Sequence, residues 1–154
     1  MRALVACVLF LSGLPSAGNA ATLLCVRVRA GEREASIPVG AQSELRMTFS
    51  NSVYDSMVEE TFGVSRDGLT PSRLFYAEPR LVEFYGHEGA SYENGFWVVA
   101  PAPRRIKRLD LRVSGDATIR NSVDGQSIFI RDSGAGGANA QLSVETCGSV
   151  NDEQ

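Results

Sequence analysis

The sequence of 154 residues holds one histidine and one tryptophan, and it has no hydrophobic run long enough to cross a membrane. The longest uncharged apolar run, residues 3–11, falls far short of the ~20 residues that a spanning helix needs. A single imidazole leaves little scope for histidine chemistry, whereas fifteen glycines and six prolines predict many turns. A net charge of −3 and a pI of about 5.2 disfavour nucleic-acid binding, and 44% hydrophobic residues exclude a disordered chain.

The first twenty residues have the organisation of a secretory signal peptide. Arg2 supplies the positive charge, residues 3–11 form the apolar core, and small residues precede a cleavage site after Ala20. A lipoprotein signal ending at Cys7 is the alternative, but cleavage there would leave almost no apolar segment. The sequence therefore predicts a periplasmic or secreted protein that is soluble after cleavage. We expect the protein to have one domain over residues 21–150 and a disordered tail over residues 151–154.

Two cysteines, Cys25 and Cys147, remain once the signal peptide and Cys7 are removed. An even number of cysteines in an oxidising compartment favours a disulfide between them. The alternative, a pair of reactive thiols, lacks a Cys-x-x-Cys spacing or a neighbouring histidine. We expect a structural disulfide that ties the first apolar segment of the domain to the last.

Short segments rich in β-branched and aromatic residues alternate with turn residues along the whole domain. The predicted strands are Thr22–Arg29, Glu34–Val39, Glu44–Ser50, Val58–Val64, Leu69–Ala77, Arg80–Tyr85, Phe96–Val99, Ile106–Val113, Ser127–Arg131 and Ala140–Cys147. No window keeps apolar residues at helical spacing over three turns, and Ser52–Glu60 is the best of the poor helical candidates. The pattern predicts an all-β antiparallel sandwich or flattened barrel of about eight to ten strands, with Phe96–Val99 central and a flexible loop at 133–139.

One group of acidic residues with the single histidine could hold a divalent cation: Asp55, Glu59, Glu60, His87 and Glu88. On a strand Glu59 and Glu60 point to opposite faces, so at most one of them could join Asp55, and a solvated face is the alternative. His87 follows a glycine in a loop, where functional residues concentrate, and it could serve a hydrolase as general base. No nucleophile motif accompanies it.

The basic run Arg104–Arg108 is the one concentration of positive charge. It could bind a carboxylate or an acidic partner through guanidinium forks, or it could protect an exposed strand edge from pairing.

Aromatic residues flank the glycine-rich loop over residues 86–95. We assign Phe84, Phe96 and Trp97 to the core, and Tyr85 and Tyr92 to the rim of a surface.

Two segments, Phe49–Val53 and Val58–Phe62, resemble the hallmark of a family of small exported proteins of unknown function. In that hallmark His-Ser-Val is followed after a few residues by Pro-Val-Glu-Glu and an aromatic residue. The matching positions are Ser52, Val53, Val58, Glu59, Glu60 and Phe62. Asn51 stands where the family has His, and Met57 where it has Pro. The segments at 84–89 and 94–99 are similar to a glycine-rich loop and a strand of the same family.

Members of this family are commonly encoded beside TRAP-type transporters of the TAXI class, or fused to them. The resemblance implies a non-enzymatic periplasmic accessory or binding protein, without a cofactor, whose partner is a membrane transporter component. We expect its surface where the Asn51–Glu60 segment meets the 86–95 loop. Asn51 and Ser52 would form hydrogen bonds there, Glu59 or Glu60 would supply charge, and His87 would lie at the rim. The alternatives are a module that binds a divalent metal or a small carboxylate solute, and, less favoured, a hydrolase using His87.

Overall fold

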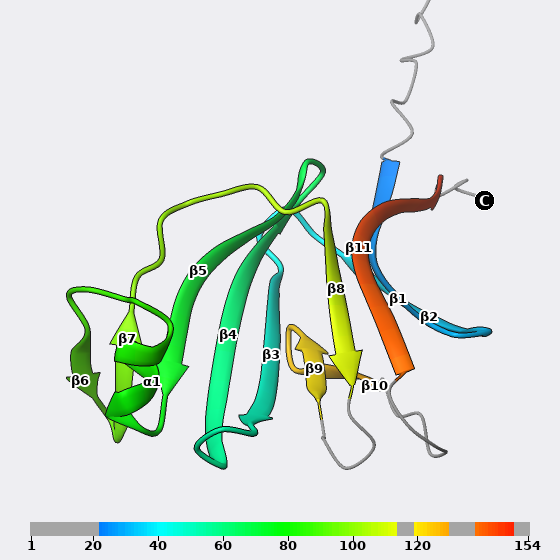
Figure 1. Cartoon of the computed structure of the whole chain (residues 1–154). Coiled ribbons are helices and arrows are strands. Elements are labelled where there is room, and N and C mark those ends of the chain that lie inside the picture. Colours follow the sequence, from blue (N-terminus) through cyan, green and yellow to red (C-terminus); the bar gives the residue numbers. More distant parts are fainter. Residues whose placement is uncertain (1–21, 114–118, 130–137, 150–154) are drawn as a thin grey trace, which may run out of the picture.

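Two antiparallel β-sheets pack face to face in the computed structural model, which describes residues 22–113, 119–129 and 138–149 (Figure 1). The all-β sandwich predicted from the sequence is confirmed. The predicted signal peptide, the tail at 151–154 and most of the predicted loop at 133–139 lie outside the described residues.

The smaller sheet has four strands in the spatial order β2-β1-β11-β8. They are β1 (Thr22–Ala30), β2 (Arg33–Val39), β8 (Arg108–Val113) and β11 (Ala138–Ser149). The larger sheet has seven strands in the order β10-β9-β3-β4-β5-β7-β6. They are β3 (Glu44–Asn51), β4 (Ser56–Ser65), β5 (Gly68–Tyr76), β6 (Ser91–Glu93), β7 (Phe96–Val99), β9 (Arg120–Val123) and β10 (Gln126–Phe129).

The main core lies between the sheets because alternate residues of each strand point inward. Val26 and Val28 of β1 face Leu45 and Met47 of β3 within one buried cluster, which also includes Phe62. The period-two pattern read from the sequence therefore gives the correct inward face for both strands. A second, smaller cluster lies on the same face of the larger sheet, beyond the edge of the smaller sheet, where the helix α1 (Pro79–Phe84) packs on β5 and β7 (Figure 1).

The helix α1 replaces the strand predicted over Arg80–Tyr85, so that prediction is wrong. Pro79 lies in the first helical turn, where its missing N–H is not needed, and the Glu78 side chain accepts a hydrogen bond from the Arg80 backbone nitrogen. Leu81 and Val82 face the sheet and are buried. Among the described residues no helix is long and apolar enough to span a membrane.

Phe84 is 52% exposed, so its assignment to the core is also wrong. It follows the buried Val82 by two positions, which places it roughly 200° around the helix, on the solvent side. Phe96 and Trp97 are half-buried, because β7 lies one strand from the edge of its sheet rather than at the centre.

The described residues form eleven strands, against the eight to ten expected. The additional strands are β6, inside the predicted 86–95 loop, and β9, which the sequence pattern did not indicate. Ser52–Glu60 is a turn followed by β4 rather than a helix, and Ala138 and Asn139 belong to β11 rather than to a loop.

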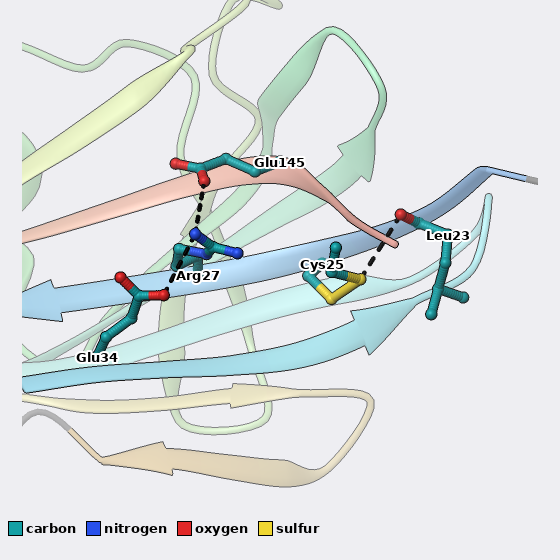
Figure 2. Close-up of a disulfide and its surroundings, with 6 residues drawn as sticks. Leu23, Cys25, Arg27, Glu34 and Glu145 are labelled. Carbon is teal, nitrogen blue, oxygen red and sulfur yellow. Dashed lines mark hydrogen bonds and ion pairs between the residues drawn. A yellow bond between two sulfur atoms is a disulfide. The ribbon is translucent and has the colours of Figure 1, made fainter. Parts of the chain in front are cut away.

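The disulfide between Cys25 and Cys147 joins the neighbouring strands β1 and β11, as predicted (Figure 2). The two Cα atoms are 5.5 Å apart, across a sequence separation of 122. On the same outer face Arg27 lies between the carboxylates of Glu34 and Glu145, with N–O distances of 3.2 Å to each (Figure 2). The disulfide and the Arg27–Glu145 ion pair join the two strands that come from opposite ends of the domain, and the Arg27–Glu34 ion pair joins β1 to β2.

Candidate functional site

Asn51 joins the turn between β3 and β4 to the end of α1. Its Oδ1 accepts hydrogen bonds from the backbone nitrogens of Val53 (2.9 Å) and Tyr54 (3.2 Å), which shapes the turn. Its Nδ2 donates to the hydroxyl of Tyr85, 3.0 Å away, in the residue that ends the helix. Because both the oxygen and the nitrogen of this buried amide form hydrogen bonds, Asn51 fixes the position of the turn relative to α1.

Tyr76, Tyr85 and His87 pack together next to this contact, and we call these three residues the Tyr–His cluster. The ring of Tyr76 stacks on those of Tyr85 and His87, with centroids 5.6 Å and 5.7 Å apart. The Tyr76 hydroxyl and His87 Nε2 are 2.8 Å apart and share a hydrogen bond. Burial raises the pKa of Tyr76, and the nearby charges of Glu60 and Tyr85 raise it further. The phenol therefore remains neutral, and His87 is its hydrogen-bond partner.

Replacing His87 with alanine leaves the Tyr76 hydroxyl, in a side chain only 1% exposed, without this partner. We expect His87→Ala to lower the free energy of unfolding by about 1–3 kcal/mol in urea denaturation, the usual cost of an orphaned buried polar group. In a Tyr76→Phe background the same substitution should cost less, because no hydroxyl is left to satisfy. Equal costs in the two backgrounds would show that the hydrogen bond contributes nothing.

Glu60 faces the interior from the middle of β4. Its cross-strand neighbours are Met47, in the main core, and Leu74, in the cluster under α1, so the carboxyl lies between the two apolar clusters. Burial raises the pKa of Glu60, and the positive charge of Arg104 opposes the rise. The charge of Glu60 also raises the pKa of Tyr76, which couples Glu60 to the Tyr–His cluster.

The raised pKa of Glu60 predicts a pH-dependent loss of stability. The folded chain holds this proton more tightly than the unfolded chain, so stability falls as the pH rises from about 4.5, the ordinary value, through the higher folded value. Glu60→Gln removes this dependence, and we expect it to be more stable than the parent at pH 7, with the difference shrinking at acidic pH. Thermal unfolding between pH 4 and 8 measures the effect; a parallel pH profile for the two proteins contradicts it.

The other predicted site residues are divided between two faces of the sheet. Ser52 and Asp55 are exposed in the turn after Asn51, and Asp55 accepts a hydrogen bond from the Ser50 hydroxyl at 3.4 Å. Glu59 lies on the outer face, 3.6 Å from the guanidinium of Arg46, opposite to Glu60 as the strand period predicted. The structure thus connects Asn51 and His87 through two tyrosines, adds Glu60 beside them, and separates Glu59 from them.

No group of three or more His, Cys, Asp or Glu side chains within the described residues is arranged to hold a metal ion. The five candidate ligands therefore do not converge: Glu59 lies on the outer face, and Glu88 is an exposed loop residue. His87 makes its side-chain contacts with Tyr76 and Tyr85 rather than with a serine or a carboxylate. The geometry favours a positioning role for the imidazole.

The basic run at 104–108 forms part of the crossover from β7 to β8. Arg105 pairs with Asp67 at 3.0 Å and Arg108 with Asp110 at 3.0 Å. Between them the backbone of Ile106 exchanges two hydrogen bonds with Leu69, of 2.8 and 2.9 Å. Gly68 permits this contact, because a Cβ there would lie 2.5 Å from the Ile106 carbonyl oxygen. Much of the positive charge is thus balanced locally, over the β4–β5 hairpin.

Several large apolar side chains are exposed on the larger sheet, its turns and α1. Within the described residues they are Val53, Met57, Phe84, Tyr85 and Tyr92. Three of them, Val53, Phe84 and Tyr85, lie where the β3–β4 turn meets α1, and we call these the apolar patch. Tyr54 connects the two elements, since its ring meets that of Phe84 edge-on with centroids 5.9 Å apart. Tyr85 and Tyr92 are exposed, as expected for rim residues.

A separate hollow of about 350 Å³ lies on the larger sheet near the β9–β10 turn. It is lined by Glu44, Arg46, Ser122, Asp124 and Gly125. Its charged groups are already engaged, since Arg46 contacts Glu44 and the Asp124 carboxylate accepts from the Glu44 backbone nitrogen at 2.9 Å. This hollow contains none of the predicted site residues.

Comparisons with known protein families, with curated proteins and with solved structures give no match for this chain. The resemblance to the transporter-linked family therefore stays a prediction.

Proposed function

We propose that this chain is a non-enzymatic exported binding protein whose binding surface is the apolar patch of Val53, Phe84 and Tyr85, and that it serves as an accessory to a TRAP-type solute uptake system. The observation that carries the proposal is the exposure of these three side chains on two elements that Asn51 and Tyr54 tether to each other. Val53 is 61% exposed and Phe84 52%. Exposed apolar groups that gather in one place are typical of protein interaction sites.

The patch is held in place before any partner binds, which supports this role. Asn51 fastens the turn to Tyr85, and the buried Leu81 and Val82 anchor α1 to the sheet. A surface fixed in this way loses little conformational entropy on association. Aromatic side chains such as those of Phe84 and Tyr85 are also the residue types that commonly carry binding energy at interfaces.

The hydrolase alternative is less supported, because the side chain of His87 is engaged with a buried tyrosine. The metal alternative is less supported because the described carboxylates do not converge. Calorimetric titration with Ca²⁺, Zn²⁺ and C4-dicarboxylates separates both binding alternatives from the accessory role, for which we expect no heat.

Affinity capture from a detergent extract of the cells' own membranes tests the accessory role. The exported chain is expected to retain a transporter membrane component, and Phe84→Ser and Val53→Ser to lose it. Ser36→Ala, an exposed position in β2 on the smaller sheet, is the matched control and should retain it. Capture of no transporter component by the parent chain, or equal capture by Phe84→Ser, would contradict the proposal.

A further inference from the structure

The charges around the apolar patch are predominantly negative after the local ion pairs are taken into account. Arg80 pairs with Glu78 at 2.9 Å, and Arg73 pairs with Glu93 at 2.7 Å. These two arginines are therefore already paired with carboxylates. Arg80 is also held over the ring of Tyr54, with its guanidinium carbon 4.8 Å from the ring centroid.

Three exposed carboxylates remain on the elements that carry the patch: Asp55 in the turn, Glu83 in α1 and Glu88 just after it. Within the described part of the chain none of the three forms an ion pair, and Asp55 only accepts the weak hydrogen bond from Ser50. An apolar centre with acidic groups around it complements a partner with the opposite charge.

We infer that the apolar patch binds a segment of a partner protein in which apolar anchor residues are flanked by lysine or arginine, an inference that rests on the proposed function. The anchors would contact Val53 and Phe84, and the basic groups would lie near Asp55, Glu83 and Glu88. The acidic surroundings disfavour an anionic membrane surface. A second copy of the chain is disfavoured because two arginines of its basic run already pair with Asp67 and Asp110.

Two synthetic peptides test the inference against the full exported chain. Both carry the same leucine and phenylalanine positions, with lysine at every polar position in one and glutamate in the other. Fluorescence anisotropy should show the lysine peptide binding at least about tenfold more tightly, with an affinity that falls as salt is added. Binding of neither peptide, or equal binding of both, overturns the inference.

Neutralising the three carboxylates identifies the surface. The triple variant Asp55→Asn, Glu83→Gln, Glu88→Gln should bind the lysine peptide about tenfold more weakly, as expected if each exposed pair contributes modestly. Asparagine is chosen at 55 because the backbone there has φ +46°, which asparagine tolerates. A control variant with the same charge change at remote positions, Glu32→Gln, Asp67→Asn, Asp110→Asn, should bind as the parent does. A loss of affinity in the triple variant that is no larger than the loss in the control overturns the assignment.

The patch could instead bind an anionic membrane surface or a second copy of the chain, and each of these would give a distinct result that overturns the inference. Binding to vesicles of anionic phospholipid that the triple variant strengthens assigns the patch to a membrane surface. A dimer in sedimentation that Phe84→Ser abolishes assigns the patch to a second copy.

If Phe84→Ser abolishes capture of the transporter component while the two peptides bind equally, the proposed function stands and only the partner's charge is wrong. If the parent captures no component, the proposed function itself fails.

Discussion

Replacing both Cys25 and Cys147 with alanine is expected to lower the free energy of unfolding by about 4–5 kcal/mol. The disulfide joins residues 122 apart in the sequence, so its loss frees almost the whole unfolded domain to expand. In the folded state the strands β1 and β11 stay paired along nine registered positions, so little native contact is lost with the bond. Most of the cost therefore comes from the greater entropy of the unfolded chain.

Urea denaturation of the disulfide-bonded protein and of the double variant measures this difference from their midpoints. The parent treated with a reductant should unfold at the midpoint of the double variant, and the double variant should be insensitive to the reductant. A shift of less than about 1 kcal/mol would mean that strain in the bond, or structure in the reduced unfolded chain, cancels the entropic effect.

Truncating Leu81 to alanine is expected to cost about 2–5 kcal/mol and to detach α1 from the sheet. Leu81 is fully buried in the smaller cluster, at 0% exposure, and a helix of six residues has no stability of its own. Once α1 is free, Tyr85 and His87 lose their positions on Tyr76, and the apolar patch is dispersed.

Hydrogen exchange shows whether the loss is local. The backbone nitrogens of Tyr85 and His87 donate to the carbonyls of Leu81 and Val82, at 3.0 and 2.9 Å, and their exchange should accelerate most in Leu81→Ala. Phe84→Ala, in the same helix but on an exposed side chain, is the control and should leave these amides protected. Unchanged exchange in Leu81→Ala would show that α1 is held by contacts other than its buried face.

The sheet architecture follows from the sequence because alternation fixes which face of each strand is buried. Val26 and Val28 alternate with Cys25 and Arg27, and the structure buries the valines between the sheets. Turns could also be predicted from the sequence. The Asp-Gly pair at 124–125 predicted a hairpin turn, and both residues adopt the positive φ that such a turn requires. Cys25 and Cys147 are the two cysteines that follow the predicted signal peptide, and the predicted disulfide joins them.

The errors arise where a local pattern is short or interrupted. The helix α1 has only six residues, too few for a helical period to be distinguished from a strand, although Pro79 following Glu78 was an available start signal. Strand β9 was missed because Asn121 occupies an inward, buried position where an apolar residue would have marked the strand.

The candidate site was only partly predictable, since its contacts join distant parts of the chain. The sequence indicated Asn51 and His87 and the segments that carry them. It gave no sign that Tyr76 of β5 would lie between these segments and bind the imidazole. Such a contact depends on the register of β4 and β5 and on the position of α1, and neither follows from local pattern.

Photo-crosslinking in intact cells tests the central claim, that the junction of the β3–β4 turn with α1 is the binding surface. A benzophenone amino acid replaces Phe84 in one version of the full chain and Gln141, exposed on the outer face of β11, in another. We predict a crosslink from position 84 to a transporter membrane component and none to that component from position 141. Crosslinks to it from both positions, or from 141 alone, or no crosslink from 84, would contradict the claim.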